Sequence, residues 1–303
     1  MHYPRLLLSG MLLVTSAALR ADDAWRSLFN GTNLDGWTTF LAKPEAKWGW
    51  NLPDLKKGAD GNYAEPIGFN HDPLGVFKVE TVDGHPAVHV SGQGFGVMTT
   101  VQPFANYDFK VQVKWGEHEW GYKVGLARDA GLLYHCVGLA GIDHGTWPNC
   151  LEFQIQEHDF GDLYALGSTQ VTVNASRMAA APVGTAPPVA GKRIPRYWIY
   201  DAHGAPMLFV QKPPNGNRCV KLEDRELPHG EWNQLELIVI GADSIHIVNG
   251  KVVMRLHNAQ IRLGSEMVPL TVGQISLQTE GAECYYRNMK IRPIEAVPPE
   301  FAN

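Results

Sequence analysis

The sequence predicts an all-β fold in which two antiparallel sheets pack face to face as a sandwich. Short segments of alternating apolar and polar residues, bounded by Gly, Pro, Asn and Asp, recur along the chain, and long amphipathic helical patterns are missing. Roughly ten such strands at this spacing suggest two packed antiparallel sheets. The expected strands cover residues 77–82, 87–90, 107–115, 130–137, 151–157, 233–240, 244–248, 251–256, 274–278 and 284–291.

One connection between these strands is a tight hairpin, and two other segments are long loops. Val248-Asn249-Gly250-Lys251 is typical of a hairpin turn because Asn and Gly tolerate the positive φ that such turns require. Residues 43–72 and 174–226 break the strand rhythm, and loops of that length are usually functional or disordered. Aromatic and short apolar runs within 174–226 favour an ordered insertion near the site. We therefore expect a single domain over residues 22–303 with a loop-rich insertion at about 174–226.

The N-terminus has the pattern of a secretory signal peptide over residues 1–21. Arg5 supplies a positive charge, residues 6–19 are apolar, and Ala21 is a small residue before the expected cut. The apolar stretch is too short to span a bilayer comfortably, and no later stretch is long enough. These features predict a secreted or periplasmic protein with no membrane span. The net charge of −5 gives no basic field for nucleic acid or anionic lipid, so neither is expected as a partner.

The cysteine content allows two disulfides in an oxidising compartment. Cys136 and Cys150 lie on neighbouring expected strands, so a bridge between them is the favoured pairing, with Cys219 and Cys284 left for the second. Four buried free thiols are the alternative. A zinc site is disfavoured because no two cysteines are close in sequence.

The segment 151–157, which reads LEFQIQE, carries the clearest indication of a site. Alternate side chains of a strand point to opposite faces, so Leu151, Phe153 and Ile155 would face a core. The other face would present one carboxylate and two amides, from Glu152, Gln154 and Gln156. Such groups can grip a sugar or hold a metal. A polar face exposed to solvent is the alternative interpretation.

Several motifs, in the same order along the chain, resemble the 3-keto-disaccharide hydrolase domain family. The opening SLFNGTNLDGW resembles that family's SLFNG-x-x-L-x-GW motif, and LEFQI resembles its EFQI strand. The matching segments are residues 27–37, 129–135, 151–155, 161–164, 230–233, 248–250, 273–278 and 286–291. They span almost all of the chain after the expected signal. The resemblance implies a concanavalin A-like jelly roll that acts on glycosides whose C3 hydroxyl has been oxidised to a ketone.

Three positions depart from the family pattern near the expected site. Asp129 stands where the family usually has Asn, His135 where it has Arg, and Glu280 where His is common. The substrate or metal preference is therefore expected to differ from that of other members.

The implied chemistry is a β-elimination. A C3 ketone acidifies the hydrogen on C2, and removal of that proton gives an enolate that can expel the aglycone from C1. The reaction needs a base near C2 and an electrophile at the ketone oxygen. A divalent metal held by oxygen and imidazole ligands would serve as that electrophile. Water can then add to the product, which gives net hydrolysis.

On this interpretation the expected residues fall into three overlapping sets. The catalytic set is Glu152, His135 and Glu280. The metal ligands are Glu152, His135 and Gln154. The substrate-binding set is Gln154, Gln156, Gln278, Arg287 and Trp147. Further loop candidates are His144, His158, Asp159 and Asp162, and further stacking candidates are Trp115, Trp120, Tyr122 and Tyr164.

Each residue also has a purely structural alternative, such as core filling for an aromatic or an ion pair for Arg287. Two other functions compete with the keto-glycoside enzyme. An ordinary retaining glycosidase needs a second carboxylate about 5 Å away, which the 151–157 strand does not supply, although Glu280 could come from another strand. A non-catalytic lectin-like module would share the fold, and fold does not decide function.

Overall fold

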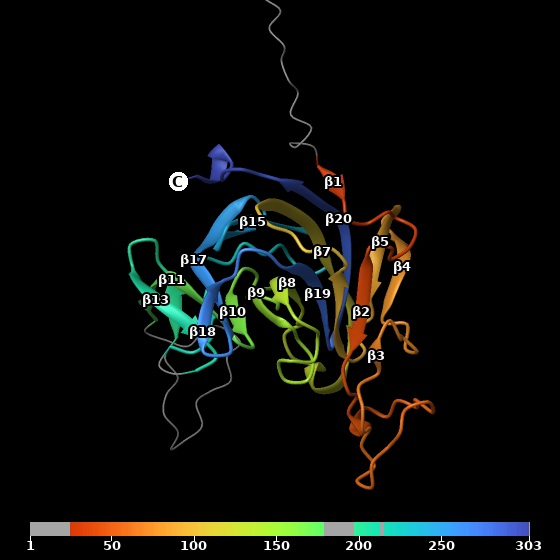
Figure 1. The fold of residues 1–303 in the computed structure, drawn as a ribbon. Coiled ribbons are helices and arrows are strands. Elements are labelled where there is room, and N and C mark those ends of the chain that lie inside the picture. The colour runs from red at the N-terminus through yellow and green to blue at the C-terminus, as the bar shows by residue number, and fades with distance from the viewer. Residues whose placement is uncertain (1–24, 179–196, 213–214, 303) are drawn as a thin grey trace, which may run out of the picture.

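The computed structural model describes residues 25–178, 197–212 and 215–302, which form two antiparallel sheets packed as a sandwich (Figure 1). The larger one, called here the large sheet, has 12 strands, of which nine follow the order β12-β11-β17-β16-β15-β7-β20-β5-β4. Three short strands pair at its sides: β1 with β20, β13 with β11 and β18 with β17. Its strands are β1 (Arg26–Ser27), β4 (Phe77–Val82), β5 (His85–Val90), β7 (Tyr107–Glu119), β11 (Thr169–Arg177), β12 (Trp198–Tyr200), β13 (Ala205–Val210), β15 (Asn233–Ile240), β16 (Asp243–Val248), β17 (Lys251–Leu263), β18 (Glu266–Pro269) and β20 (Ala282–Pro293).

The second sheet, called here the small sheet, has eight strands in the order β14-β10-β9-β8-β19-β6-β2-β3. The described helices are short 3-10 turns, and none is long and apolar enough to cross a membrane. The strands are β2 (Trp37–Leu41), β3 (Gly68–Phe69), β6 (Phe95–Thr100), β8 (Gly131–Val137), β9 (Asn149–Gln154), β10 (Leu163–Leu166), β14 (Arg218–Cys219) and β19 (Gln274–Glu280). The 3-10 turns are η2 (Ala46–Trp48), η3 (Gly121–Lys123) and η4 (Pro299–Phe301).

One hydrophobic core lies between the two sheets. Leu151 and Phe153 of β9 enter it, as does Ile155 just beyond the strand, and all three are fully buried. Val111 on β7 and Leu237 on β15 reach the same core from the large sheet. The expected all-β, two-sheet antiparallel sandwich is confirmed, and the alternation in 151–155 correctly assigns the core-facing side chains.

Each of the ten expected strands overlaps an observed strand, and the differences lie mainly at their ends. β17 continues to Leu263, well beyond the expected end at residue 256. β9 stops at Gln154, so residues 155–157 are not part of the strand as expected. The hairpin between β16 and β17 has the expected geometry, with positive φ at Asn249 (48°) and Gly250 (76°).

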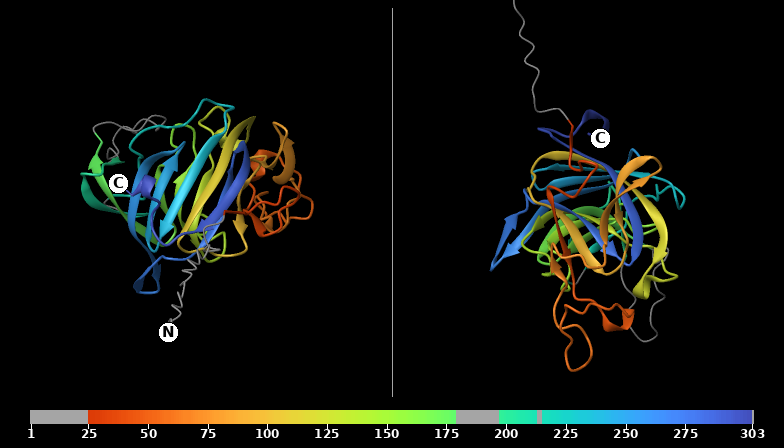
Figure 2. Two further views of the ribbon diagram at one scale, coloured as in Figure 1. Left: turned by 90° about the horizontal axis from the view of Figure 1, so that it is seen from above. Right: turned by 90° about the vertical axis from the view of Figure 1, so that its right-hand side faces the viewer.

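The two long loops lie at opposite edges of the sandwich (Figure 2). Residues 43–72 contain only η2 and β3, as expected of a long loop. The described part of 174–226 adds β12 and β13 beside β11 and places β14 beside β10. This insertion therefore contributes strands to both sheets. Residues 179–196 and the expected signal peptide lie outside the described residues.

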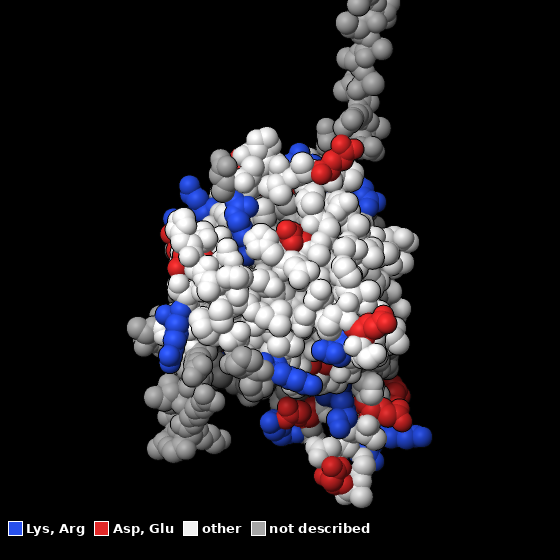
Figure 3. Space-filling view, turned by 60° about the vertical axis from the view of Figure 1, so that its left-hand side comes forward, with Lys and Arg blue, Asp and Glu red and all other residues white. Residues whose placement is uncertain are grey.

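All four cysteines are buried free thiols, so the favoured Cys136–Cys150 bridge is not formed. The two side chains are nevertheless neighbours. Burial and a hydrogen bond with Cys136 both raise the pKa of the Cys150 thiol. On the molecular face that Figure 3 shows, charged side chains surround a broad uncharged area and make no continuous field of Lys and Arg.

Candidate functional site

The outer face of the small sheet, which points away from the core, holds a buried carboxylate. Glu152 is only 4% exposed and lies between Leu133 of β8 and Tyr164 of β10. Its Oε1 and the Oε1 of Gln278 both lie above the Cα of Gly131, where a Cβ would meet them at 2.3 and 2.4 Å. Only glycine at this position leaves room for both side chains. Glu152 of the expected polar row therefore lies on this face, beside Gln278 of β19.

Further charged side chains complete what we call the carboxylate cluster: Asp129, Glu152 and Glu280 with the cation of Lys123. Asp129 lies two residues before the start of β8, Glu280 ends β19, and Lys123 ends η3. Lys123 and Asp129 form an ion pair that is almost entirely buried. Electrostatic interactions link Lys123 to both glutamates. Three carboxyl groups thus share one ammonium group.

Burial raises the pKa of all three carboxyl groups in this cluster. For Glu152 the negative charge of Asp129 raises the pKa further, whereas a hydrogen bond from Gln278 and the charge of Lys123 oppose the rise. For Glu280 burial is reinforced by Asp129 and Glu152, and only Lys123 opposes it. The two glutamates thus have raised pKa values in different surroundings. Pairs of carboxyl groups with different environments are a common basis for acid and base roles.

Two buried acceptor oxygens in this region have no hydrogen-bond partner. They are Oδ1 of Asp129, which is 6% exposed, and Oε1 of Gln278, which is 1% exposed. Buried acceptors are normally satisfied, and each unsatisfied one calls for an explanation. A bound molecule with two donor groups could satisfy both oxygens.

The insertion closes one side of the cluster with a second set of charges. Arg218 pairs with Asp159 at 2.8 Å and with Asp162 at 2.7 Å. Lys221 lies 3.7 and 3.6 Å from the same two carboxylates. Asp162 is fully buried and also accepts the backbone N–H of Lys221 at 2.9 Å. These contacts attach the end of the insertion to the β9–β10 loop, which explains the fixed position of Asp162.

Three aromatic side chains, Tyr122, Phe95 and Trp48, lie beside the carboxylate cluster and are called here the aromatic wall. Tyr122 is 48% exposed, and its ring meets that of Phe95 at 5.6 Å between centroids. Phe95 in turn meets Trp48 of the long 43–72 loop at 5.2 Å. Tyr122 interacts electrostatically with Glu280, so the wall adjoins the charged groups. Trp147, the expected stacking residue, is instead 9% exposed and packs in an apolar cluster that includes Phe40, so it presents little surface to a sugar.

Of the other predicted stacking residues, Trp115 and Tyr164 are occupied by protein contacts. Trp115 is a core residue whose indole N–H lies 3.3 Å from a Glu226 oxygen. Tyr164 lies under the guanidinium of Arg218 at 5.5 Å.

The two amides of the 151–157 segment make local contacts. The Gln154 oxygen accepts the backbone N–H of Ile155 at 2.8 Å and of Gln156 at 3.1 Å. These two hydrogen bonds end strand β9 at Gln154. The Gln154 oxygen therefore serves the backbone and does not point toward a metal ion. Gln156 donates to Asp159 at 2.9 Å and accepts weakly from Lys123 at 3.5 Å. Gln156 thus links the two groups of charges.

Among the described contacts, none joins Glu152, Gln154 and His135, the metal ligands predicted from the sequence. His135 lies at a bulge of β8 with a φ of +51°, and its closest ring neighbour is Tyr134. Burial lowers the pKa of His135 to about 4, and neither ring nitrogen has a hydrogen-bond partner in the described structure. With Gln154 engaged by the backbone, Glu152, Gln154 and His135 do not fit a shared metal ion.

Arg287 is separated from Glu152 by the sandwich itself. It lies on β20 of the large sheet, with its guanidinium 3.9 Å from the ring centre of Trp232. Its Nε donates to Gln112 at 2.8 Å. The side chain consequently has a structural environment and does not reach the carboxylate cluster.

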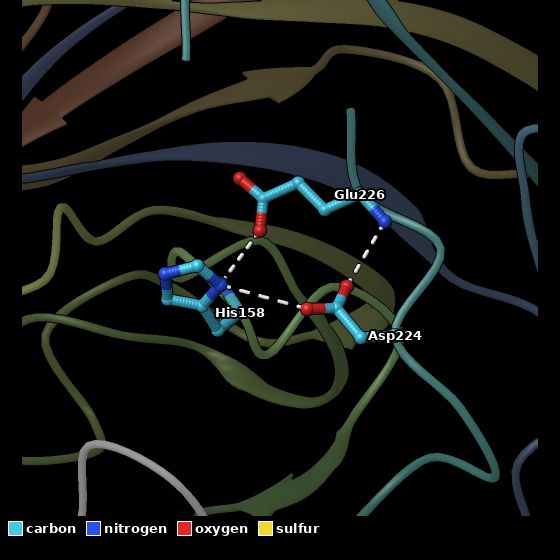
Figure 4. Close-up of side chains that lie close together, drawn as sticks. All are labelled: His158, Asp224 and Glu226. Carbon is cyan, nitrogen blue, oxygen red and sulfur yellow. Dashed lines mark hydrogen bonds and ion pairs between the residues drawn. The ribbon is translucent and has the colours of Figure 1, made fainter. Parts of the chain in front are cut away.

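A different group of side chains has the arrangement of metal ligands. His158 from the β9–β10 loop, and Asp224 and Glu226 from the segment before β15, point toward one another (Figure 4). One ligand atom from each lies within 4.8 Å of the others, and within the described ranges this is the only such group found. Burial raises the pKa of Glu226 to about 7.

The sequence reasoning missed several of these residues. Lys123 lies in a 3-10 turn without periodicity, and Arg218 and Lys221 lie in the insertion, where no strand pattern indicated their positions. Asp224 and Glu226 also fall in that segment. Asp159, Asp162 and His158 were candidates because the 156–162 stretch is dense in possible ligands.

Comparison with known proteins identifies the family. No curated protein matches the chain. Among solved structures, a putative glycosyl hydrolase from Parabacteroides distasonis shares 16% identity at a TM-score of 0.43, covering 90% of this chain and 100% of that one. The carbohydrate binding module CBM66 from Bacillus subtilis shares 10% identity at a TM-score of 0.39, covering 71% and 91%. The family described as the 3-keto-alpha-glucoside-1,2-lyase-like domain matches residues 24–292. The resemblance seen in the sequence motifs is therefore confirmed, and the chain belongs to this family.

Proposed function

We propose that this protein is an exported enzyme that cleaves 3-keto-glycosides at the outer face of the small sheet. The observation that carries the proposal is the buried Glu152, whose pKa is raised by burial, beside Glu280 and Lys123. Family membership supports glycosidic bond cleavage at a keto sugar.

In this mechanism Glu152 removes the proton from C2 of the keto sugar. The electron pair of the broken C–H bond forms the C2–C3 double bond, and the ketone oxygen at C3 becomes an enolate. The ammonium group of Lys123 stabilises that negative charge electrostatically. The enolate then reforms the ketone as a C1–C2 double bond forms and the bond from C1 to the aglycone oxygen breaks.

The departing oxygen needs a proton, and we assign its donation to Glu280. Its pKa is raised by burial and by two neighbouring carboxylates, so it retains a proton at higher pH than an ordinary glutamate. Water that adds across the new double bond would convert elimination into net hydrolysis. A divalent metal would also stabilise the enolate, but no described contact joins Glu152, His135 and Gln154, so no step is assigned to it.

The test is incubation of the protein with p-nitrophenyl 3-keto-glucosides, following both released nitrophenol and the absorbance of the enone. We expect turnover by the wild-type protein and a loss of at least about 100-fold in Glu152→Gln. Failure of folded wild-type protein to cleave keto-glycosides of either anomer would refute the proposal. Binding of the keto sugar without cleavage would indicate the lectin-like module instead.

An ordinary two-carboxylate glycosidase is the second candidate, because the structure gives Glu152 two carboxyl neighbours from other segments. Asp129 and Glu280 both interact with it electrostatically. Such an enzyme would cleave p-nitrophenyl glucosides that carry an ordinary C3 hydroxyl. The same assay with unoxidised glucosides separates the two reactions.

A further inference from the structure

His158, Asp224 and Glu226 form a compact group in which two loops meet. His158 belongs to the β9–β10 loop, and the two carboxylates belong to the chain between β14 and β15 (Figure 4). The Nδ1 of His158 lies 3.5 Å from Oδ2 of Asp224. Ligand atoms from all three residues lie within 4.8 Å of one another. Small rotations of exposed side chains would bring them to the distances of a coordination sphere.

The donor set is mixed, which separates it from an ordinary acidic surface patch. One imidazole nitrogen with two carboxylate oxygens suits Mn²⁺, Fe²⁺, Co²⁺ or Zn²⁺, whereas Mg²⁺ and Ca²⁺ prefer oxygen ligands alone. We propose that His158, Asp224 and Glu226 bind one divalent transition-metal ion. This site differs from the Glu152–His135–Gln154 set expected from the sequence.

Hydrogen bonds hold the two carboxylates and the backbone of His158 in place before any ion binds. The backbone N–H of His158 donates to Oε2 of Glu226 at 2.5 Å, and that of Glu226 donates to Oδ1 of Asp224 at 2.9 Å. The indole N–H of Trp115 lies 3.3 Å from Oε1 of Glu226. The ammonium of Lys221 bonds the carbonyl of His158. Partners of this kind orient metal ligands and raise the affinity for the metal. Each carboxylate oxygen still has a free lone pair with which it can bind an ion.

The site is open to solvent on the side opposite these partners. The side chains of His158 and Asp224 are 70% and 43% exposed. An ion can therefore enter directly, and three protein ligands leave positions for water or for other oxygen donors. If the proposed function holds, vicinal oxygens of the sugar are candidates for those positions, because Asp159 of the adjoining charged group is the next residue.

The ion would also join the insertion to the small sheet. Asp224 and Glu226 lie beyond Lys221 on the chain, and His158 is next to Asp159, so the ion would add a second connection beside the Arg218–Asp159 pair. Metal binding should therefore stabilise the fold as well as fill the site. This gives a readout that does not depend on catalysis.

The experiment is a titration of tag-free, metal-stripped protein with Mn²⁺, followed by electron paramagnetic resonance, and with Co²⁺, followed by visible absorption. We expect one saturable ion per chain and a higher melting temperature with the ion bound. His158→Ala and Asp224→Asn should each weaken binding by at least about 100-fold, since even partners outside the ligand set are worth 10- to 100-fold. Circular dichroism of each variant checks that it is folded.

A matched control exists on the large sheet. His257 and Asp243 form an exposed pair at 3.2 Å, which resembles the His158–Asp224 pair but has no third ligand among the described residues. His257→Ala should leave Mn²⁺ affinity within about twofold of wild type. Unsaturable binding, or equal binding by wild type and His158→Ala, would overturn the metal site. Glu152→Gln should bind Mn²⁺ normally, so loss of keto-glycoside turnover and loss of the metal are distinguishable.

Discussion

Two glutamates on opposite faces of the sandwich are almost equally buried but have opposite pKa shifts. Glu152 on the small sheet is 4% exposed, and Glu283 on the large sheet is 6% exposed. Burial by itself raises the pKa of both carboxyl groups. The pKa of Glu152 ends well above its ordinary value, whereas the pKa of Glu283 falls to about 2. Burial and the neighbouring groups together decide the difference.

Glu283 is surrounded by hydrogen-bond donors. The backbone N–H groups of Glu117 and His118 lie at 2.8 and 3.1 Å, and the hydroxyl of Tyr285 at 3.1 Å. Ring nitrogens of His118 and His89 lie at 2.9 and 2.8 Å. Glu152 instead has Gln278 as its donor and a second carboxylate, Asp129, nearby. A carboxylate surrounded by donors stays ionised and acts as a structural element, whereas a carboxyl group with a raised pKa can take up and release a proton.

The strongest test of this contrast is Glu152→Gln. Loss of the base should lower kcat on a 3-keto-glucoside by about 100- to 10,000-fold, as is usual for general base catalysis. Stability should stay equal or rise, because the substitution removes a buried charge. Kinetics and urea unfolding of the same preparation measure both effects. A variant that unfolds easily and still turns over would assign Glu152 the structural role that we give to Glu283.

Lys123→Met tests whether the cation of the carboxylate cluster acts in the reaction. Loss of the enolate partner should lower kcat by about 100-fold. The single variant leaves Asp129 buried and unpaired, which should also destabilise the fold by about 3 kcal/mol or more. The double variant Lys123→Met with Asp129→Asn should recover stability without recovering turnover.

Lys114→Met is the matched control for this experiment. Lys114 pairs with Asp83 at 3.0 Å, but it lies on β7 of the large sheet. It should change neither kcat nor stability by more than a small amount, since exposed ion pairs contribute little. Recovery of turnover in the double variant would show that Lys123 only compensates Asp129.

Glu283→Gln should lower stability and leave turnover almost unchanged, which is the reverse of the effects expected for Glu152→Gln. The amide cannot satisfy the same set of donors, so we expect a loss of about 2–3 kcal/mol in unfolding free energy. Turnover should change less than threefold. Glu80→Gln is the control, because Glu80 contacts the other nitrogen of His89 at 3.1 Å but is 44% exposed. It should cost roughly 0.5 kcal/mol or less.

The sequence predicted the faces of strands better than the partners of side chains. Alternation placed Leu151 and Phe153 in the core and Glu152 outside, because the period of a strand is fixed by its backbone. It could not locate the end of β9, since that depends on the Gln154 side chain accepting backbone N–H groups beyond the strand. Residues 155–157 therefore lie outside β9, although they were expected to be part of the strand.

The alternation of apolar and polar residues also predicts on which face of its strand a side chain lies, but it does not predict which of the two sheets the strand joins. Arg287 is correctly polar-facing on its strand, yet that strand belongs to the large sheet and the residue stacks on Trp232. Lys123 gave no periodic signal because it lies in a turn of three residues. Its position depends on the pairing of β7 with β20 and on the nearby Asp129. Such contacts between distant segments require the structure.

The smallest expected effect is a difference in pH dependence between the two glutamates. Glu283 has a folded pKa of about 2 and an ordinary value of 4.5. Its stabilising contribution is therefore complete above pH 4.5 and is lost as pH falls toward 2. The folded pKa of Glu152 is raised, so its ionisation opposes folding at high pH, and this penalty disappears as pH falls toward 4.5.

Urea unfolding of wild type and both glutamine variants between pH 3 and 8 separates these effects. The wild-type advantage over Glu283→Gln should be constant above pH 4.5 and shrink below it. The stability of wild type relative to Glu152→Gln should instead increase as pH falls from 8 to 5, because the wild-type carboxyl group takes up a proton in the folded state. Parallel curves for wild type and Glu152→Gln over that range would mean that Glu152 has an ordinary pKa, which would remove the basis for its role as the base.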